Sequence, residues 1–298
     1  MSVVTPAICQ DKPADSDKTY DIKAKYTVGD LLKYQMKMNM NMAMTTPSGS
    51  SPIPGGGGEM VMSSGLRYKT AGIKPDGTAV IVIQTEDAKS SMMGQEMQMP
   101  ATPPVTMEVD ARGIGKMRGM ENQPGGQMLA QLMNMNKMPS MGVALPDHPV
   151  KIGESWEVEI PSPMGKIKMA GTLIGVEAVG GVESLKIKLV TTMPLDMKMG
   201  AGGTPVSDAS KAMVIMTGSS VTNSIVNIQA DNARLLKLAG DMNVEMKMEM
   251  KGEAASQSPF GGELNMKMDG KMSMNLTSAG KVPAAAPAKA VTKADKKG

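Results

Sequence analysis

The stretch from Asp30 to Met44 reads D-L-L-K-Y-Q-M-K-M-N-M-N-M-A-M. From Leu32 onward the bulky apolar side chains fall on even-numbered positions, and polar or small side chains fall between them. A period of two places successive side chains on opposite faces of an extended chain, so this stretch predicts a β-strand with one buried and one solvated face. At about 3.4 Å per residue the strand would be roughly 50 Å long, which requires a large twisted sheet around it.

The composition favours the same fold class. The chain has 298 residues, which is enough for one large all-β domain or two small ones. It contains 35 Met against 1 Phe, 1 Trp and 4 Tyr, so methionine takes the place of aromatics as the bulky apolar residue. The 33 Gly and 20 Pro suit a chain with many turns.

Charge and hydropathy exclude two classes of function. The formal net charge is +3, but the tail from Lys281 to Gly298 alone carries five lysines against Asp295, a net of +4, which leaves about −1 for the rest. A body near neutrality lacks the basic face that nucleic-acid binding requires. No apolar run approaches the 18 or more residues of a membrane-spanning helix, so the sequence predicts a chain that does not span a membrane.

The N-terminal residues suggest the compartment. Val3 to Gln10 resembles the last part of a signal peptide, with small residues at Ala7 and Cys9 where a cleavage site would place them, while the charged region and most of the apolar core are missing. We therefore expect a periplasmic or secreted protein whose signal peptide is truncated in this sequence. Cys9 is the only cysteine, so no intrachain disulfide is possible.

Turn signals divide the chain into hairpins. Lys74-Pro75-Asp76-Gly77 and Asp110-Ala111-Arg112-Gly113 each separate two alternating segments, and Val179-Gly180-Gly181 does the same later in the chain. The alternating segments Leu236–Met250 and Leu264–Leu276 should form a long final hairpin. The stretch 128–136 (M-L-A-Q-L-M-N-M-N) is the best helix candidate.

Two motifs recur in the same order and predict an internal duplication. Residues 28–36 align without a gap on residues 152–160, with Leu32 matching Trp156. The hairpin at 110–119 matches the one at 231–240. The predicted organisation is a polar lead-in or signal-peptide remnant at 1–20, a first β pseudo-repeat at 21–145 with the short helix, a second at 146–278, and a disordered Ala/Pro/Lys tail at 279–298.

The paired strand openings Val28-Gly29-Asp30 and Ile152-Gly153-Glu154, the hairpin turns and the linker from Leu145 to Trp156 (L-P-D-H-P-V-K-I-G-E-S-W) carry a resemblance. On these motifs the chain resembles a bacterial envelope family of unknown function, and is similar to the half-barrel lipoprotein carriers of the LolA and LolB type. The resemblance covers about residues 20–278 and implies a concave apolar sheet that holds acyl chains. Its motifs are structural, so it assigns no functional residue.

The residues themselves give little support to catalysis. His148 is the only histidine and lies between Asp147 and Pro149 in a predicted linker. No serine lies in a nucleophile elbow, and no Cys/His pair has metal-ligand spacing. The carboxylates alternate with lysines on the polar faces of strands, as a solvated surface would place them. We therefore expect neither an enzyme nor a bound cofactor.

The methionines leave three interpretations open. They could simply fill the core, because methionine is apolar, unbranched and adaptable. They could line a surface that repacks around varied apolar guests, as flexible thioethers do at promiscuous binding sites. They could also hold Cu(I) or Ag(I), since soft metals favour thioether ligands and cross-strand neighbours lie about 5 Å apart.

The sequence thus predicts an all-β protein: one large curved antiparallel sheet, half-barrel or clam-like, built from two pseudo-repeats with a short connecting helix. The predicted function is non-catalytic binding of a hydrophobic small molecule, lipid or lipidated partner in the cell envelope, with Cu(I)/Ag(I) binding and a purely structural role as alternatives. Tyr34 and Trp156, near the starts of matching strands, are either core anchors or a stacking platform. The candidate ligand-binding residues are Tyr34, Met36, Met38, Met40, Met42, Trp156, Met246, Met248, Met266 and Met268.

Overall fold

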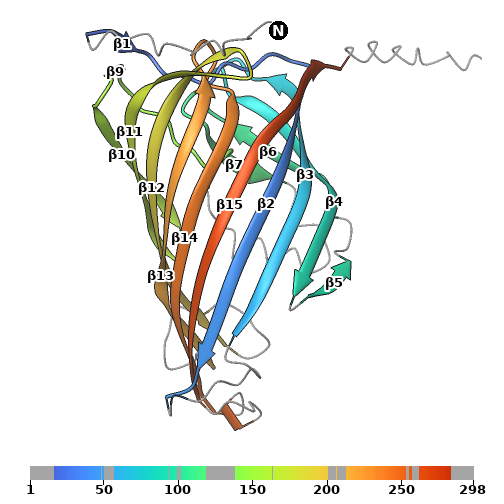
Figure 1. Ribbon diagram of the computed structural model, residues 1–298, viewed down its shortest axis with the longest axis vertical. Coiled ribbons are helices and arrows are strands. Elements are labelled where there is room, and N and C mark those ends of the chain that lie inside the picture. The colour runs from blue at the N-terminus through green and yellow to red at the C-terminus, as the bar shows by residue number, and fades with distance from the viewer. Residues whose placement is uncertain are drawn as a thin grey trace, which may run out of the picture.

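A computed structural model gives the arrangement of the chain (Figure 1). It describes residues 17–47, 49, 57–92, 94–98, 102–118, 138–162, 164–200, 206, 213–252, 255–256 and 262–282. Almost all of the regular structure in these ranges is β-strand, and nearly all strands belong to a single antiparallel sheet that curls into a nearly closed barrel with one seam. The predicted fold class is confirmed, whereas the predicted helix at 128–136 lies outside the described residues.

The strands differ widely in length, and the longest ones run from the wide end of the molecule to its narrow end (Figure 1). Their bounds are β1 Thr19–Tyr20, β2 Asp30–Thr45, β3 Gly57–Ile73, β4 Ala79–Met92, β5 Gln95–Gln98, β6 Val105–Val109, β7 Ile114–Arg118, β8 Met138–Pro139, β9 Val150–Lys151, β10 Ser155–Ser162, β11 Gly165–Val179, β12 Val182–Met199, β13 Val214–Gln229, β14 Leu235–Met250 and β15 Glu263–Lys281.

The sheet order is β10-β11-β12-β13-β14-β15-β2-β3-β4-β6-β7-β8, with β5 added beside β4. Neighbours along this path follow one another in the chain with two exceptions: β6 lies beside β4 although β5 comes between them in the chain, and β2 lies beside β15 and thereby joins the two halves. The short strands β1 and β9 form a separate antiparallel pair. The predicted hairpins at Lys74–Gly77, Asp110–Gly113 and Val179–Gly181 and the long final hairpin are confirmed by the registers of these pairs.

Strand β2 matches the prediction from its sequence almost residue for residue. Even-numbered side chains from Leu32 to Met44 are buried or half-buried, and the odd-numbered ones are exposed except for Gln35. Gly29 and Gly153, which precede the two matching strand openings, have φ of +87° and +89°. Residues other than glycine rarely adopt this left-handed backbone conformation, which explains why glycine is found at both openings.

Each half of the chain runs as an antiparallel meander, from β2 to β8 and from β10 to β15. The hairpin turns before β7 and β14 share a side-chain cap: Asp110 Oδ1 accepts from the Arg112 amide, and Asn232 Oδ1 accepts from the Arg234 amide, both at 2.9 Å. These parallels agree with a duplication, and superposition of the halves stays a prediction.

The packed core occupies the wide end of the molecule. Leu173, Ile187, Val226 and the other buried residues of the main cluster come from both halves. The seam between β10 and the end of the sheet is bridged there, because the indole N–H of Trp156 donates to the carbonyl of Ala144 at 3.0 Å. Backbone bonds from Ala24 to Ala111 and from Lys25 to Asn232 attach residues 21–27 to both capped hairpin turns.

Strands extend past two of the predicted boundaries. Strand β15 continues to Lys281, where Ala279, Gly280 and Lys281 pair with Leu32, Leu31 and Asp30, so the first three residues of the predicted disordered tail belong to the sheet. Backbone pairing with β2 decides their structure even though their side chains show no apolar period. At the other end, Thr19 and Tyr20 of the predicted lead-in form β1.

Candidate functional site

The inner surface of the curved sheet carries most of the described methionines. Tyr34 is buried in the core and fixes which face of β2 points inward. Directly paired residues of antiparallel strands share one face, so the register extends that face from β2 to its neighbours. We call the resulting surface the methionine face, and it consists of Met36, Met38, Met40, Met42, Met44, Met60, Met62, Met242, Met246, Met248, Met266, Met268, Met272 and Met274.

The register pairs several of the candidate methionines directly with one another. Met42 pairs with Met268, and Met44 pairs with Met266, which in turn pairs with Met246. Met248 lies beside Leu264 in the same pair of strands. The single face therefore unites residues more than 200 positions apart in the chain.

Rows of three paired methionines cross the sheet at several levels, and two of these rows include both β2 and β3. In one row, Met62 of β3 pairs with Met38 of β2, which pairs with Met272 of β15. In the next row, Met92 of β4 pairs with Met60, which pairs with Met40. Directly opposed side chains in such rows have their Cβ atoms about 5 Å apart, so the thioethers of a row are within reach of one another.

The methionine face is half-buried, in contrast to the core. Within it, only Met42 and Met274 are buried, each at 8% exposure. Gly270 of β15 faces the same side, and a Cβ there would lie 2.8 Å from Cγ of Met40, so the Met40 side chain lies over this glycine. The face is thus continuous and apolar, with flexible side chains that are only partly covered by the described residues.

The two aromatic candidates lie elsewhere. Tyr34 is 1% exposed, its hydroxyl donates to the carbonyl of Leu235 at 3.2 Å, and its ring meets that of Tyr68 edge-on at 5.4 Å. Trp156 is 5% exposed and hydrogen-bonded across the seam. Both positions favour the core-anchor interpretation over a stacking platform.

Burial dominates the electrostatics of these tyrosines. It raises the pKa of Tyr68 to about 12. Burial, and then the neighbouring Tyr68, raise the pKa of Tyr34 further above its ordinary value. These phenols remain protonated at neutral pH and serve as hydrogen-bond donors inside the core.

Sequence reasoning missed Ser64. This serine faces inward on β3, opposite Met36, and is 5% exposed. Its hydroxyl is a buried side-chain polar atom without a hydrogen-bond partner in the described part of the chain. The only available signal was a serine at an apolar position of an alternating segment.

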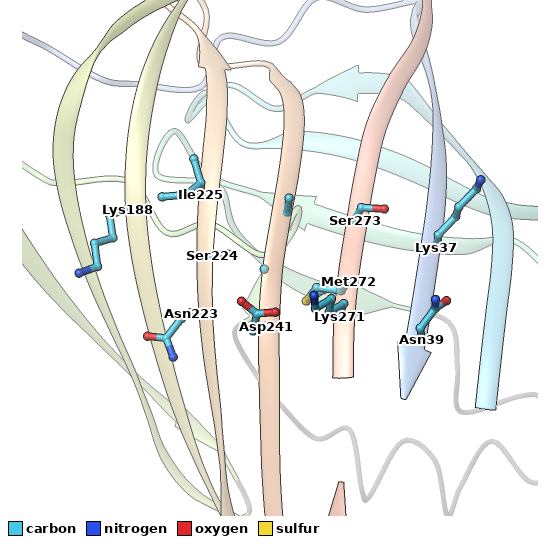
Figure 2. Close-up of a pocket in the computed structure, with 12 residues that line it drawn as sticks. Lys37, Asn39, Lys188, Asn223, Ser224, Ile225, Asp241, Lys271, Met272 and Ser273 are labelled. Carbon is cyan, nitrogen blue, oxygen red and sulfur yellow. The ribbon is translucent and has the colours of Figure 1, made fainter. Parts of the chain in front are cut away.

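The outer face holds a separate hollow of about 600 Å³ (Figure 2). Small residues such as Ala239 and Ser273 line it together with Lys37, Lys188, Lys271 and Asp241. Most of these residues have the outward parity of their strands, so the hollow lies on the opposite side of the sheet from the methionine face.

The polar side chains of the described residues form mainly exposed pairs. In the described ranges no three His, Cys, Asp or Glu side chains are grouped to hold a metal ion. His148 contacts Asp147 at 2.8 Å in an exposed position, and this hydrogen bond lowers the pKa of Asp147. Exposed ion pairs such as Lys166–Glu159 lower the pKa of the carboxyl group in the same way.

Among the described residues, no helix has the length and apolar character needed to cross a membrane.

Comparison with known proteins shows no matching family model and no matching curated protein. One solved structure, titled "Lipid-protein interactions in lipovitellin", aligns with a TM-score of 0.46 and 10% sequence identity. The alignment covers 89% of this chain and 27% of that one, so the chain spans about a quarter of the other protein's length.

Proposed function

We propose that this protein is a non-catalytic binding protein that holds a hydrophobic ligand, a lipid or the acyl chain of a lipidated partner, against the methionine face. The observation that carries the proposal is the continuity of this half-buried apolar surface over β14, β15, β2 and β3. From Met36 to Met44 it extends about 27 Å along β2, long enough for an extended hydrocarbon chain.

The use of methionine on this face supports a bound apolar ligand rather than a fixed core. Methionine has no special strand preference, and β-branched residues would be the ordinary choice for a sheet that only packs on itself. Flexible thioethers adapt their shape to different apolar partners at little cost in strain. A location in the cell envelope belongs to the same proposal, as the resemblance to half-barrel lipoprotein carriers implies.

A matched pair of substitutions on β2 tests the proposal. Met40 faces inward and Asn39 faces outward, one residue away, where it lines the outer hollow. Met40→Lys should weaken binding of the fluorescent hydrocarbon diphenylhexatriene at least tenfold, because a charge would enter the apolar surface. Asn39→Lys adds the same charge and should leave probe binding unchanged.

Both variants are checked for strand content by circular dichroism before titration. Equal binding by Met40→Lys and the parent would contradict the proposal. Loss of binding in Asn39→Lys alone would place the probe in the outer hollow instead.

The three-methionine rows favour a second candidate function, the binding of Cu(I) or Ag(I). Thioether sulfur is a soft donor that selects Cu(I), and three such donors in adjacent strands could converge on one ion. Replacing Met38, Met62 and Met272 by leucine should then remove one bound Ag(I) per chain, as counted by native mass spectrometry. Met97, an exposed methionine on β5, supplies the control substitution. An unchanged Ag(I) count in the triple variant would argue against metal binding by this row.

A further inference from the structure

Ser64 combines burial with an unused hydroxyl. The residue is 5% exposed, and its Oγ has no hydrogen-bond partner among the described residues. Its backbone carbonyl is satisfied, because Nε2 of Gln35 donates to it at 3.2 Å. A buried hydroxyl that makes no hydrogen bond has lost its contact with water and destabilises the ligand-free protein. Because this hydroxyl lowers the stability of the ligand-free protein, we looked for a role that it could have in binding.

The local backbone gives Ser64 an unusual setting. The register between β3 and β4 shifts between Ser63 and Gly65, where Ser63 pairs with Lys89 and Gly65 pairs with Glu86. On the β4 side of this irregularity Asp87 has φ of +48°, a left-handed conformation that few residues other than glycine adopt. Bulges of this kind often lie beside functional sites, where they redirect a side chain.

Ser64 lies at the boundary between the packed core and the methionine face. On its own strand the inward neighbours are Leu66, which packs against the core, and Met62, which begins one of the three-methionine rows. Across the pair with β2 it faces Met36. The thioether side chains of Met36 and Met62 are flexible enough to move aside for a guest, whereas the core beyond Leu66 is closed.

We infer that the Ser64 hydroxyl donates a hydrogen bond to the polar head of an amphiphilic ligand whose hydrocarbon tail crosses the methionine rows and extends along the strands toward the narrow end. This inference rests on the proposed function and specifies the ligand class. Apolar pockets commonly use a few placed polar groups of this kind to fix the orientation of a ligand.

The surroundings of Ser64 further restrict the head group. Its inward neighbours Met36, Met62 and Leu66 are all uncharged. The nearest cation along the strand, Arg67, has the opposite parity and pairs with Glu86. An unpaired carboxylate or phosphate buried here would remain without a counter-charge, which is strongly unfavourable. The head should therefore be an uncharged acceptor, such as an ester carbonyl.

Displacement of bound diphenylhexatriene by matched competitors tests this inference. Methyl tetradecanoate has an ester head, tetradecane has none, and tetradecanoate is charged. The parent protein should prefer the methyl ester over the hydrocarbon. In Ser64→Ala that preference should fall roughly fivefold to tenfold, the worth of one hydrogen bond, while displacement by tetradecane stays unchanged. Tetradecanoate should be the weakest competitor for both proteins.

Ser184→Ala is the matched control for stability. Ser184 is fully buried, and its hydroxyl donates to the carbonyl of Glu177 at 2.9 Å. Its loss should lower the melting temperature and leave all three displacement curves unchanged. In contrast, Ser64→Ala should leave the melting temperature of the ligand-free protein unchanged or raise it, because the variant removes an unsatisfied group.

The possible failures are distinguishable. If Ser64→Ala lowers the melting temperature as Ser184→Ala does and keeps the ester preference, the hydroxyl holds only an internal water and the inference is wrong. If the parent protein shows no ester preference but binds the probe, the inference also fails while the proposed function stands. Absence of probe binding to the parent protein would overturn the proposed function, and this inference with it.

Discussion

The inner surface of the sheet has two ends that are built from different residues. At the wide end Leu173, Ile187 and Val226 are completely buried. Toward the narrow end the same surface is formed by the half-buried methionine face. Strand β2 passes from one to the other, from Tyr34 in the core to Met44.

This difference shows that strand periodicity and packing are specified separately. Both ends keep the period of two that forms the sheet. Branched aliphatic side chains at the wide end have few rotamers and pack in one arrangement, whereas methionine has three rotatable side-chain bonds and tolerates many. We therefore expect the wide end to determine stability and the methionine end to determine binding.

The largest expected contrast comes from truncating one residue at each end. Ile187→Ala should lower the free energy of unfolding by about 2–5 kcal/mol, because it leaves a cavity in a closed core. Met40→Ala should lower it by only about 1 kcal/mol, since that side chain is half-exposed and its neighbours can adjust. Urea denaturation monitored by circular dichroism measures both. Similar losses at the two sites would mean that the methionine face is ordinary core.

A glycine at the wide end tests how closely the core is packed. A Cβ added at Gly171 would lie 2.3 Å from the Trp156 ring, which is held by its bond to Ala144. Gly171→Ala should therefore destabilise the protein by about 1–3 kcal/mol through overpacking. Gly175→Ala is the control on the same strand, because no atom lies within 4 Å of a Cβ there. If Gly171→Ala and Gly175→Ala have the same melting temperature, the Trp156 ring can move aside and the core is not closely packed there.

Alkaline pH should also act through the wide end. Unfolded tyrosine titrates near pH 10, whereas burial raises the pKa of Tyr68 to about 12 and that of Tyr34 higher still. Because only the unfolded state loses these protons above pH 10, stability is fully present below pH 10 and falls as the pH rises, by up to about 1.4 kcal/mol per pH unit for each tyrosine. Urea denaturation from pH 8 to 11.5 measures this slope.

The double variant with phenylalanine at Tyr34 and Tyr68 supplies the comparison. It should be less stable at neutral pH, since the Tyr34 hydroxyl loses its bond to Leu235, but its stability should change less above pH 10. An equally steep alkaline loss in this variant would assign the effect to other groups.

Much of the fold could be predicted because its signals are local. The alternation in β2 specifies a strand and its buried face, and the Pro75-Asp76-Gly77 turn specifies a hairpin. The pairing of β2 with β15 could not be predicted, because alternation determines which face is buried but not which strand lies alongside. The same pairing explains why residues 279–281 form strand despite a sequence typical of a disordered tail.

The candidate site was predicted in part for a related reason. The methionines were found because their parity is visible in the sequence, and the register then brings them together. Whether Tyr34 and Trp156 lie in the core or at a surface depends on contacts with Leu235 and Ala144, which are far away in the chain or across the seam. The Ser64 hydroxyl is unsatisfied because no neighbouring group in the described residues forms a hydrogen bond with it. No sequence pattern predicts such a missing partner.

The smallest effect on stability is expected where the sequence looks most unusual. Replacing Met38, Met40, Met246 and Met248 by leucine keeps apolarity and approximate volume, and each such exchange usually costs less than about 1.5 kcal/mol. At half-buried positions with flexible neighbours the combined change in melting temperature should be small. Diphenylhexatriene binding should remain nearly intact, because the ligand requires an apolar surface rather than sulfur.

Ag(I) uptake by the same fourfold variant separates the two candidate functions. Leucine has no lone pair to donate, so thioether coordination would be lost while the sheet stays folded. Retained probe binding with unchanged Ag(I) uptake would leave the apolar ligand as the function of the methionine face. Loss of tight Ag(I) uptake, with no probe binding in either protein, would favour the metal instead. If neither protein binds either ligand, the methionines merely fill the narrow end, and the difference between the two ends is one of packing alone.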